Sequence, residues 1–135
     1  MDEDKITTIR EALRSDGHRV KALGIIAKVD HLSDSLVTSW IDDIVYALND
    51  ENVEYNKYQI LEQLRRMADA CPRESVDAVP VVVEELNDSL RKLDGDDISD
   101  NKKVRLGTSI LESIVEGTDP VEDRLRIGRA DVDAF

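Results

Sequence analysis

The sequence predicts an all-α protein of about three stacked antiparallel helical hairpins. Hydrophobic residues make up 41% of its 135 residues but aromatic residues only 4%. The apolar set is mostly Leu, Ile, Val and Ala, which favours packed helices over β-sandwich strands. Apolar residues recur every three or four positions in six segments, which is the spacing of amphipathic helices. The length is typical of a single domain.

The first four segments predict two hairpins. The turn signal Ser15-Asp16-Gly17 separates the first two helices, and Ser33-Asp34-Ser35 provides a cap for the third. The fourth helix should stop at Cys71, because Pro72 disfavours the helical conformation in the residue before it. The four predicted helices cover residues 6–13, 20–27, 36–48 and 58–68.

The third predicted hairpin begins with a longer helix over residues 75–93, in which Pro80 lies close enough to the start to be tolerated. Ser99 or Asp100 could cap the sixth helix, which covers residues 104–115. Residues 121–127 could add one or two turns. The predicted domain and C-terminal tail cover residues 1–127 and 128–135.

The beginnings of the three second helices are similar to one another. Arg19-Val20-Lys21, Lys57-Tyr58-Gln59 and Lys103-Val104-Arg105 each place a basic, an apolar and a polar residue in succession. An aliphatic residue follows six positions after each centre, and these residues are Ile26, Leu64 and Ile110. Their spacing is close to the roughly 40–47 residues of HEAT and armadillo repeats.

The chain therefore resembles HEAT-repeat proteins over about residues 5–116. An Asp-bearing turn after each first helix and Pro80 inside a first helix add to the resemblance. The long insertion from Ser89 to Asp100 departs from it. The resemblance implies stacked hairpins that share one continuous core, with a groove along the second helices. A non-repetitive helical bundle with the same helices is the alternative.

The charge of the chain argues against two classes of partner. A formal net charge of −12 repels the phosphates of nucleic acid and the anionic surface of a membrane. The acidic start of the chain and the lack of an apolar run of about 18 residues predict a cytoplasmic protein. Cys71 is the one cysteine, so no internal disulfide can form.

The acidic residues are mostly Asp and the basic ones mostly Arg, a composition similar to that of proteins from salt-loving archaea. Excess carboxylates keep such surfaces hydrated in concentrated salt. We expect the melting temperature, followed by circular dichroism, to rise strongly between low and molar KCl. A melting temperature that is indifferent to KCl would contradict a halophilic origin.

No group of residues predicts catalysis, a cofactor or a metal ion. Asp94, Asp96, Asp97 and Asp100 gather four carboxylates, but an EF-hand counted from Asp94 would need Gly and Glu where the chain has Ser99 and Arg105. His18 and His31 lack the spacing of a zinc site. Cys71 has no evident base beside it in the sequence and is interpreted as a partly buried structural thiol.

The sequence thus predicts a non-enzymatic scaffold that binds a protein or peptide partner, or a second copy of the chain. The rival predictions are a nucleic-acid-binding helical-repeat protein and a structural subunit of a larger assembly. Other basic residues, such as Arg10 and Arg14, are expected to pair with carboxylates along and between helices. The predicted partner-binding residues, at matching positions of the second helices, are Arg19, Lys57, Tyr58, Arg65 and Lys103.

Overall fold

The computed structural model describes residues 2–50, 57–92 and 101–118, and this part of the chain is all-α, as predicted. It contains six α-helices, one 3₁₀ helix and no strand. The predicted segment at 121–127, the tail at 128–135 and Asp94–Asp100 lie outside the described residues. In chain order the elements are α1 (Glu3–Arg14), α2 (Arg19–Ala27), α3 (Asp34–Asn49), α4 (Lys57–Ala70), η2 (Arg73–Ala78), α5 (Val79–Arg91) and α6 (Lys102–Thr118).

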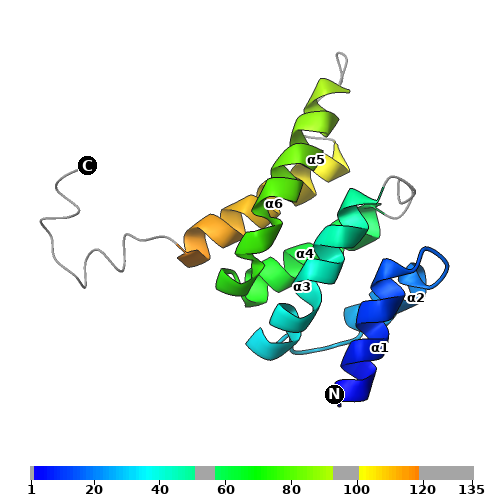
Figure 1. Cartoon of the computed structure of the whole chain (residues 1–135). Helices are drawn as coiled ribbons and strands as arrows, with labels where there is room; N and C mark the ends of the chain where they lie inside the picture. The colour runs from blue at the N-terminus through cyan, green and yellow to red at the C-terminus, as the bar shows by residue number, and fades with distance from the viewer. Residues whose placement is uncertain (1, 51–56, 93–100, 119–135) are drawn as a thin grey trace, which may run out of the picture.

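The helices follow one another from one end of the molecule to the other. α1 and α2 lie at one end, α5 and α6 at the opposite end, and α3 and α4 lie between them (Figure 1). Contacts between equivalent ends of α4 and α6 show how these two helices run relative to each other. Tyr58 near the start of α4 lies beside Lys102 at the start of α6, and Asp69 near the end of α4 accepts from Ser113 of α6. α4 and α6 therefore run in the same direction.

Side-chain caps begin three of the helices. Asp2 accepts a hydrogen bond from the Lys5 amide at 2.9 Å, and Ser33 accepts one from the Leu36 amide at 3.2 Å. Such caps satisfy amide groups that have no partner inside the helix. The predicted cap at Ser33-Asp34-Ser35 is confirmed. The prediction of Ser99 or Asp100 for the last helix is wrong, because the Asn101 side chain accepts from the Val104 amide at 3.0 Å.

The single long helix predicted over residues 75–93 is wrong at its start. Residues Arg73–Ala78 form a 3₁₀ helix, and α5 begins only at Val79. In a continuous α-helix the carbonyl of Val76 would accept from the amide of residue 80, which is proline and has no N–H. The amide of Val79 donates to Val76 instead, which is a 3₁₀ contact.

The core is one cluster of aliphatic residues around Trp40, contributed by all six α-helices. Ile26, Leu64 and Ile110 are each fully buried. The three- and four-residue spacing predicts five further apolar residues on the buried faces of the helices, but these five are exposed, and the most exposed, Val115, has 62% of its surface accessible. The other four are Val20, Val76, Val83 and Leu90. None of the described helices combines the length and apolar composition needed to cross a bilayer.

Two glycines inside helices are expected to respond oppositely to substitution. A Cβ at Gly24, on the exposed side of α2, would meet nothing within 4 Å, whereas a Cβ at Gly117 would lie 2.0 Å from the ring of Pro72. Gly24→Ala should therefore stabilise the protein by about 0.5–1 kcal/mol. Gly117→Ala should destabilise it by about 1–3 kcal/mol, because α6 must move away from Pro72. Urea denaturation of both variants measures the difference, and equal effects would contradict the packing of α6 on Pro72.

Candidate functional site

The surface around Tyr58 joins the first turns of α4 and α6. The Nζ atoms of Lys102 and Lys103 lie 5.3 and 5.5 Å from the centre of the Tyr58 ring, whose residue is 37% exposed. Lys102 also pairs with Glu62 on the next turn of α4 at 3.0 Å. Cations over an aromatic face are attracted by its quadrupole. We call these four residues, Tyr58, Glu62, Lys102 and Lys103, the Tyr58 cluster.

The structure brings some of the predicted partner-binding residues together and separates others. Tyr58 and Lys103 meet in the Tyr58 cluster. Arg65 lies further along α4, is 43% exposed and pairs with Asp69 at 3.6 Å. The Lys57 side chain is only 14% exposed and turns toward α5, where it pairs with Glu85 at 2.8 Å. The Glu85 side chain is 13% exposed and is therefore largely buried as well.

Arg19 is fully buried and offers no surface to a partner in this structure. Its Nε donates to the carbonyl of Leu13 at 2.7 Å, its Nη2 pairs with Asp50 at 3.1 Å, and its Nη1 lies 3.5 Å from Asp16. The last carbonyls of a helix lack partners inside it, and Arg19 satisfies one of them in α1. Its guanidinium therefore fixes the turn between α1 and α2.

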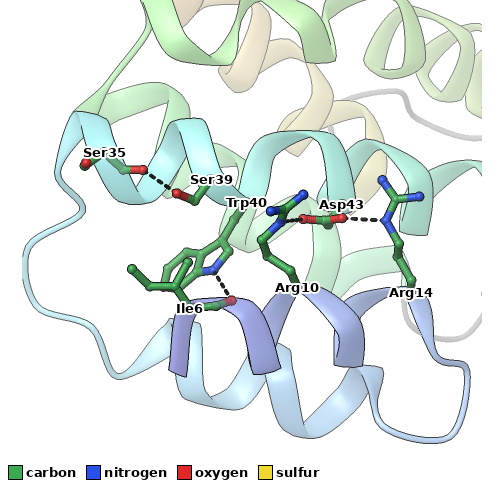
Figure 2. A network of polar contacts seen from close by, with 7 residues as sticks. All are labelled: Ile6, Arg10, Arg14, Ser35, Ser39, Trp40 and Asp43. Atoms are coloured by element: carbon green, nitrogen blue, oxygen red, sulfur yellow. Dashed lines mark hydrogen bonds and ion pairs between the residues drawn. The ribbon is translucent and has the colours of Figure 1, made fainter. Parts of the chain in front are cut away.

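A second polar network joins α1 to α3. The carboxylate of Asp43, whose side chain is 1% exposed, lies between Arg10 and Arg14 (Figure 2). Arg10 Nε donates to Oδ2 at 2.9 Å and Arg14 Nε donates to Oδ1. The hydrogen bond to Asp43 raises the pKa of Arg14 above its ordinary value. The expectation that these arginines pair with carboxylates between helices is confirmed.

The Arg14 guanidinium also lies over the ring of Tyr46, 4.6 Å from its centre. Two arginines share the one buried carboxylate of Asp43, and Asp42 is exposed on the same helix. The network is best understood as the polar contact that holds α1 on α3. The sequence could not single out Asp43, because Asp42 beside it is of the same type.

One group of possible metal ligands lies at the junction of α3, α4 and η2. The Cys71 thiol and the carboxylates of Asp34 and Glu74 come within 4.8 Å of one another. Metal binding requires the thiolate. Burial and the hydrogen bond to Asp34 raise the pKa of Cys71 to about 12, and its thiol lies 3.3 Å from the carbonyl of Leu32. These contacts fit a structural thiol and favour its protonated form.

Cys71 should therefore react slowly with thiol reagents in the folded protein. At pH 8 a pKa of about 12 leaves roughly a thousandfold less thiolate than the ordinary pKa near 9. The raised pKa also stabilises the fold below pH 9, and this contribution is lost as the pH rises toward 12. Labelling with Ellman's reagent, with and without denaturant, measures the difference. Equal rates in both conditions would contradict the buried position.

Comparison of the chain with protein-family models, with curated proteins and with solved structures finds no match.

Proposed function

We propose that the protein is a non-enzymatic interaction module in which the face of α2, α4 and α6 binds an acidic segment of a partner protein. The module would consist of three stacked hairpins, α1–α2, α3–α4 and η2/α5–α6. Two features support this arrangement: α2, α4 and α6 each bury the aliphatic residue at the matching position, Ile26, Leu64 and Ile110, and α4 lies between α2 and α6.

The observation that carries the proposal is the uneven distribution of charge. Within the described helices, α2, α4 and α6 together hold eight basic and four acidic residues. The remaining elements, α1, α3, η2 and α5, hold five basic and eleven acidic residues. Of the eight basic residues, Arg19 is buried and Lys57 turns toward α5. Six basic and four acidic residues remain nearer the surface of these helices, which makes them a positive layer in a chain with a net charge of −12.

A positive layer can attract an anion even on an acidic protein. Charges further away than a Debye length, about 10 Å at 0.1 M salt, are largely screened, so the nearby lysines and arginines decide the local attraction. The Tyr58 cluster adds an exposed aromatic ring, and Tyr and Arg are enriched among the residues that dominate binding energies in protein interfaces. Carboxylates of a partner would compete with Glu62 and Asp69 for Lys102 and Arg65.

Fluorescence anisotropy with labelled peptides tests this proposal. The probes are peptides rich in Asp, Glu and Leu, together with the same peptides in which Lys replaces the acids. We expect the acidic peptides to bind the parent protein, and the variant Arg65→Glu/Lys102→Glu to bind them at least about tenfold more weakly. The control variant Lys5→Glu/Lys92→Glu changes the net charge equally, at two exposed residues outside α2, α4 and α6, and should keep the parent affinity.

Two outcomes would contradict the proposal. Equal losses in both double variants would mean that only the net charge matters. Tighter binding of duplex DNA than of the acidic peptides, lost in Arg65→Glu/Lys102→Glu, would favour the nucleic-acid alternative, because phosphates would then be the preferred anions of the same layer. Circular dichroism of both variants verifies that their helices are intact.

A further inference from the structure

The last two described helices, α5 and α6, form an apolar groove that carries charge of one sign. The groove has a volume of about 300 Å³, and its apolar surface comes from Leu86 of α5 and from Leu111 and Val115 of α6. Among the described residues that line it, the charged ones are Glu112 and Glu116. Val115 is 62% exposed, the largest value for a bulky apolar residue of the described chain.

Neither the charge nor the apolar surface of this groove is compensated within the described chain. Glu112 and Glu116 are both exposed and lie four residues apart on α6, and like charges at this spacing destabilise a helix. No ion pair among the described residues involves either carboxylate. Apolar surface such as that of Val115 gains free energy when it is removed from water. A segment with both basic and apolar side chains would therefore be stabilised here.

The chain contains such a segment shortly after α6. Residues 124–129 read Arg-Leu-Arg-Ile-Gly-Arg, with three basic residues, two large aliphatic residues and no acidic residue. Residues 51–56 and 93–100, which also lie outside the described part of the chain, include acidic residues and no basic one. Acidic residues occur on both sides of the segment, so the charge that complements the groove is confined to these six positions. We call residues 124–129 the arginine segment.

The arginine segment is attached near enough to reach the groove. α6 ends at Thr118, and a chain spans at most about 3.3–3.6 Å per residue, so Arg124 can lie up to about 20 Å from Thr118. The groove residues of α6 run from Thr108 to Glu116, which is about 12 Å along the helix axis. Because the residue before a proline disfavours the helical conformation, Pro120 predicts a change of chain direction soon after α6.

We propose that the arginine segment binds in the α5/α6 groove of its own chain. Its two aliphatic residues would cover Val115 and Leu111, and its arginines would pair with Glu112 and Glu116. A short connection gives an effective concentration in the millimolar range, so a contact that is weak between separate molecules can still be occupied. The segment would act as a strap that closes this end of the molecule to other apolar partners.

Limited trypsin digestion of the full chain tests the apolar part of this contact, because trypsin cleaves after basic residues that it can reach. We expect Val115→Asp to accelerate cleavage after Arg124 and Arg126 at least about tenfold, since a charge enters the apolar contact and frees the segment. The control Val20→Asp, at a residue of α2 that is 47% exposed and does not line the groove, should be cleaved like the parent. Equal rates in all three proteins would overturn the proposal.

Charge reversal tests the ion pairs by NMR. The heteronuclear NOE of the Ile127 amide should fall in Glu112→Arg/Glu116→Arg and also in Arg124→Glu/Arg126→Glu. Combining the four substitutions restores opposite charges and should restore the NOE. If the combined variant stays as low as the two double variants, the ion pairs do not exist.

A matched variant controls for net charge in the same experiment. Asp77→Arg/Glu84→Arg changes the net charge as much as Glu112→Arg/Glu116→Arg, at two exposed residues that do not line the groove. It should keep the Ile127 NOE of the parent, and an equal fall would mean that only the net charge matters. Circular dichroism of every variant verifies that its helices are intact.

The dependence on concentration distinguishes the groove of the same chain from that of a second copy. We expect the Ile127 NOE to stay constant over a wide range of protein concentration, with a monomer in sedimentation velocity. An NOE that rises with concentration while the protein associates would place the segment in another molecule and overturn the proposal. The proposal does not rest on peptide binding by α2, α4 and α6. Val115→Asp should therefore keep the parent affinity for acidic peptides.

Discussion

Replacing Arg19 by alanine should lower the free energy of unfolding by about 3 kcal/mol or more. Arg19 is fully buried and donates to the carbonyl of Leu13 while pairing with Asp50. Its removal leaves the Leu13 carbonyl unsatisfied, takes one ion pair from the Asp50 carboxylate, which is 20% exposed, and opens a cavity between α1 and α2. Each of these costs free energy only in the folded state, so the loss falls on stability rather than on partner binding.

Two control variants separate the effect of the guanidinium geometry on stability from the effect of its charge and from the effect of any substitution in the same helix. Arg19→Lys keeps the charge but cannot reach acceptors in several directions, so we expect an intermediate loss of about 1–2 kcal/mol. Lys21→Ala, at an exposed residue of the same helix, should change stability by no more than about 0.5 kcal/mol. Guanidinium denaturation followed by the fluorescence of Trp40, the single tryptophan, measures all three. An Arg19→Ala variant as stable as Lys21→Ala would contradict the structural role.

The positions of the helices could be predicted because their causes are local. Apolar spacing, the stop signal at Ser15-Asp16-Gly17 and the cap at Ser33 all act within one turn of the chain. The predicted start of α5 was wrong for an equally local reason. Proline is tolerated near the start of a helix, but Pro80 still lacks the amide N–H that a continuous α-helix would need at this position. The short helical segment and the tail that the sequence predicts beyond Thr118 lie outside the described residues, so they stay predictions.

The exposed or buried state of single residues was harder to predict, because it depends on distant partners. Arg19 is of a type that is usually exposed, and its burial depends on Asp50, which is 31 residues away in the chain. Val115 has the spacing of a seam residue, but it lies on the last described helix and nothing in the described chain packs beyond it. Sequence periodicity gives the face of a helix and not the identity of its neighbour.

The candidate site was predicted in part for the same reason. Tyr58 and Lys103 were assigned by matching positions of two second helices, and they meet because α4 and α6 run side by side in the same direction. Lys102 belongs to the same cluster, although the matching positions pointed to its neighbour. Lys57 begins α4 but turns toward Glu85 of α5, a contact that arises only when helices distant in the sequence pack together.

Replacing Trp40 by alanine should destabilise the protein by about 3–5 kcal/mol, the range for deleting a buried tryptophan. Trp40 is fully buried and reaches from α3 toward α1, where its Nε1 donates to the carbonyl of Ile6 at 3.3 Å (Figure 2). Trp40→Phe keeps most of the ring volume and loses that hydrogen bond, so its expected cost is about 1–2 kcal/mol. Circular dichroism in urea measures both variants, since the fluorescent residue is gone.

The region of the fold that a Trp40 substitution destabilises can be predicted, as well as the size of the destabilisation. α1 contacts the rest of the fold through α2 and α3, and Trp40 and Asp43 make polar contacts between α3 and α1. In Trp40→Phe, amide hydrogen exchange in α1 should therefore accelerate more than exchange in α4 and α6, because α1 can open while the other helices stay packed. Equal acceleration in all helices would mean that the chain opens only as a whole. The opening of α1 would then not be separate from the unfolding of the whole chain.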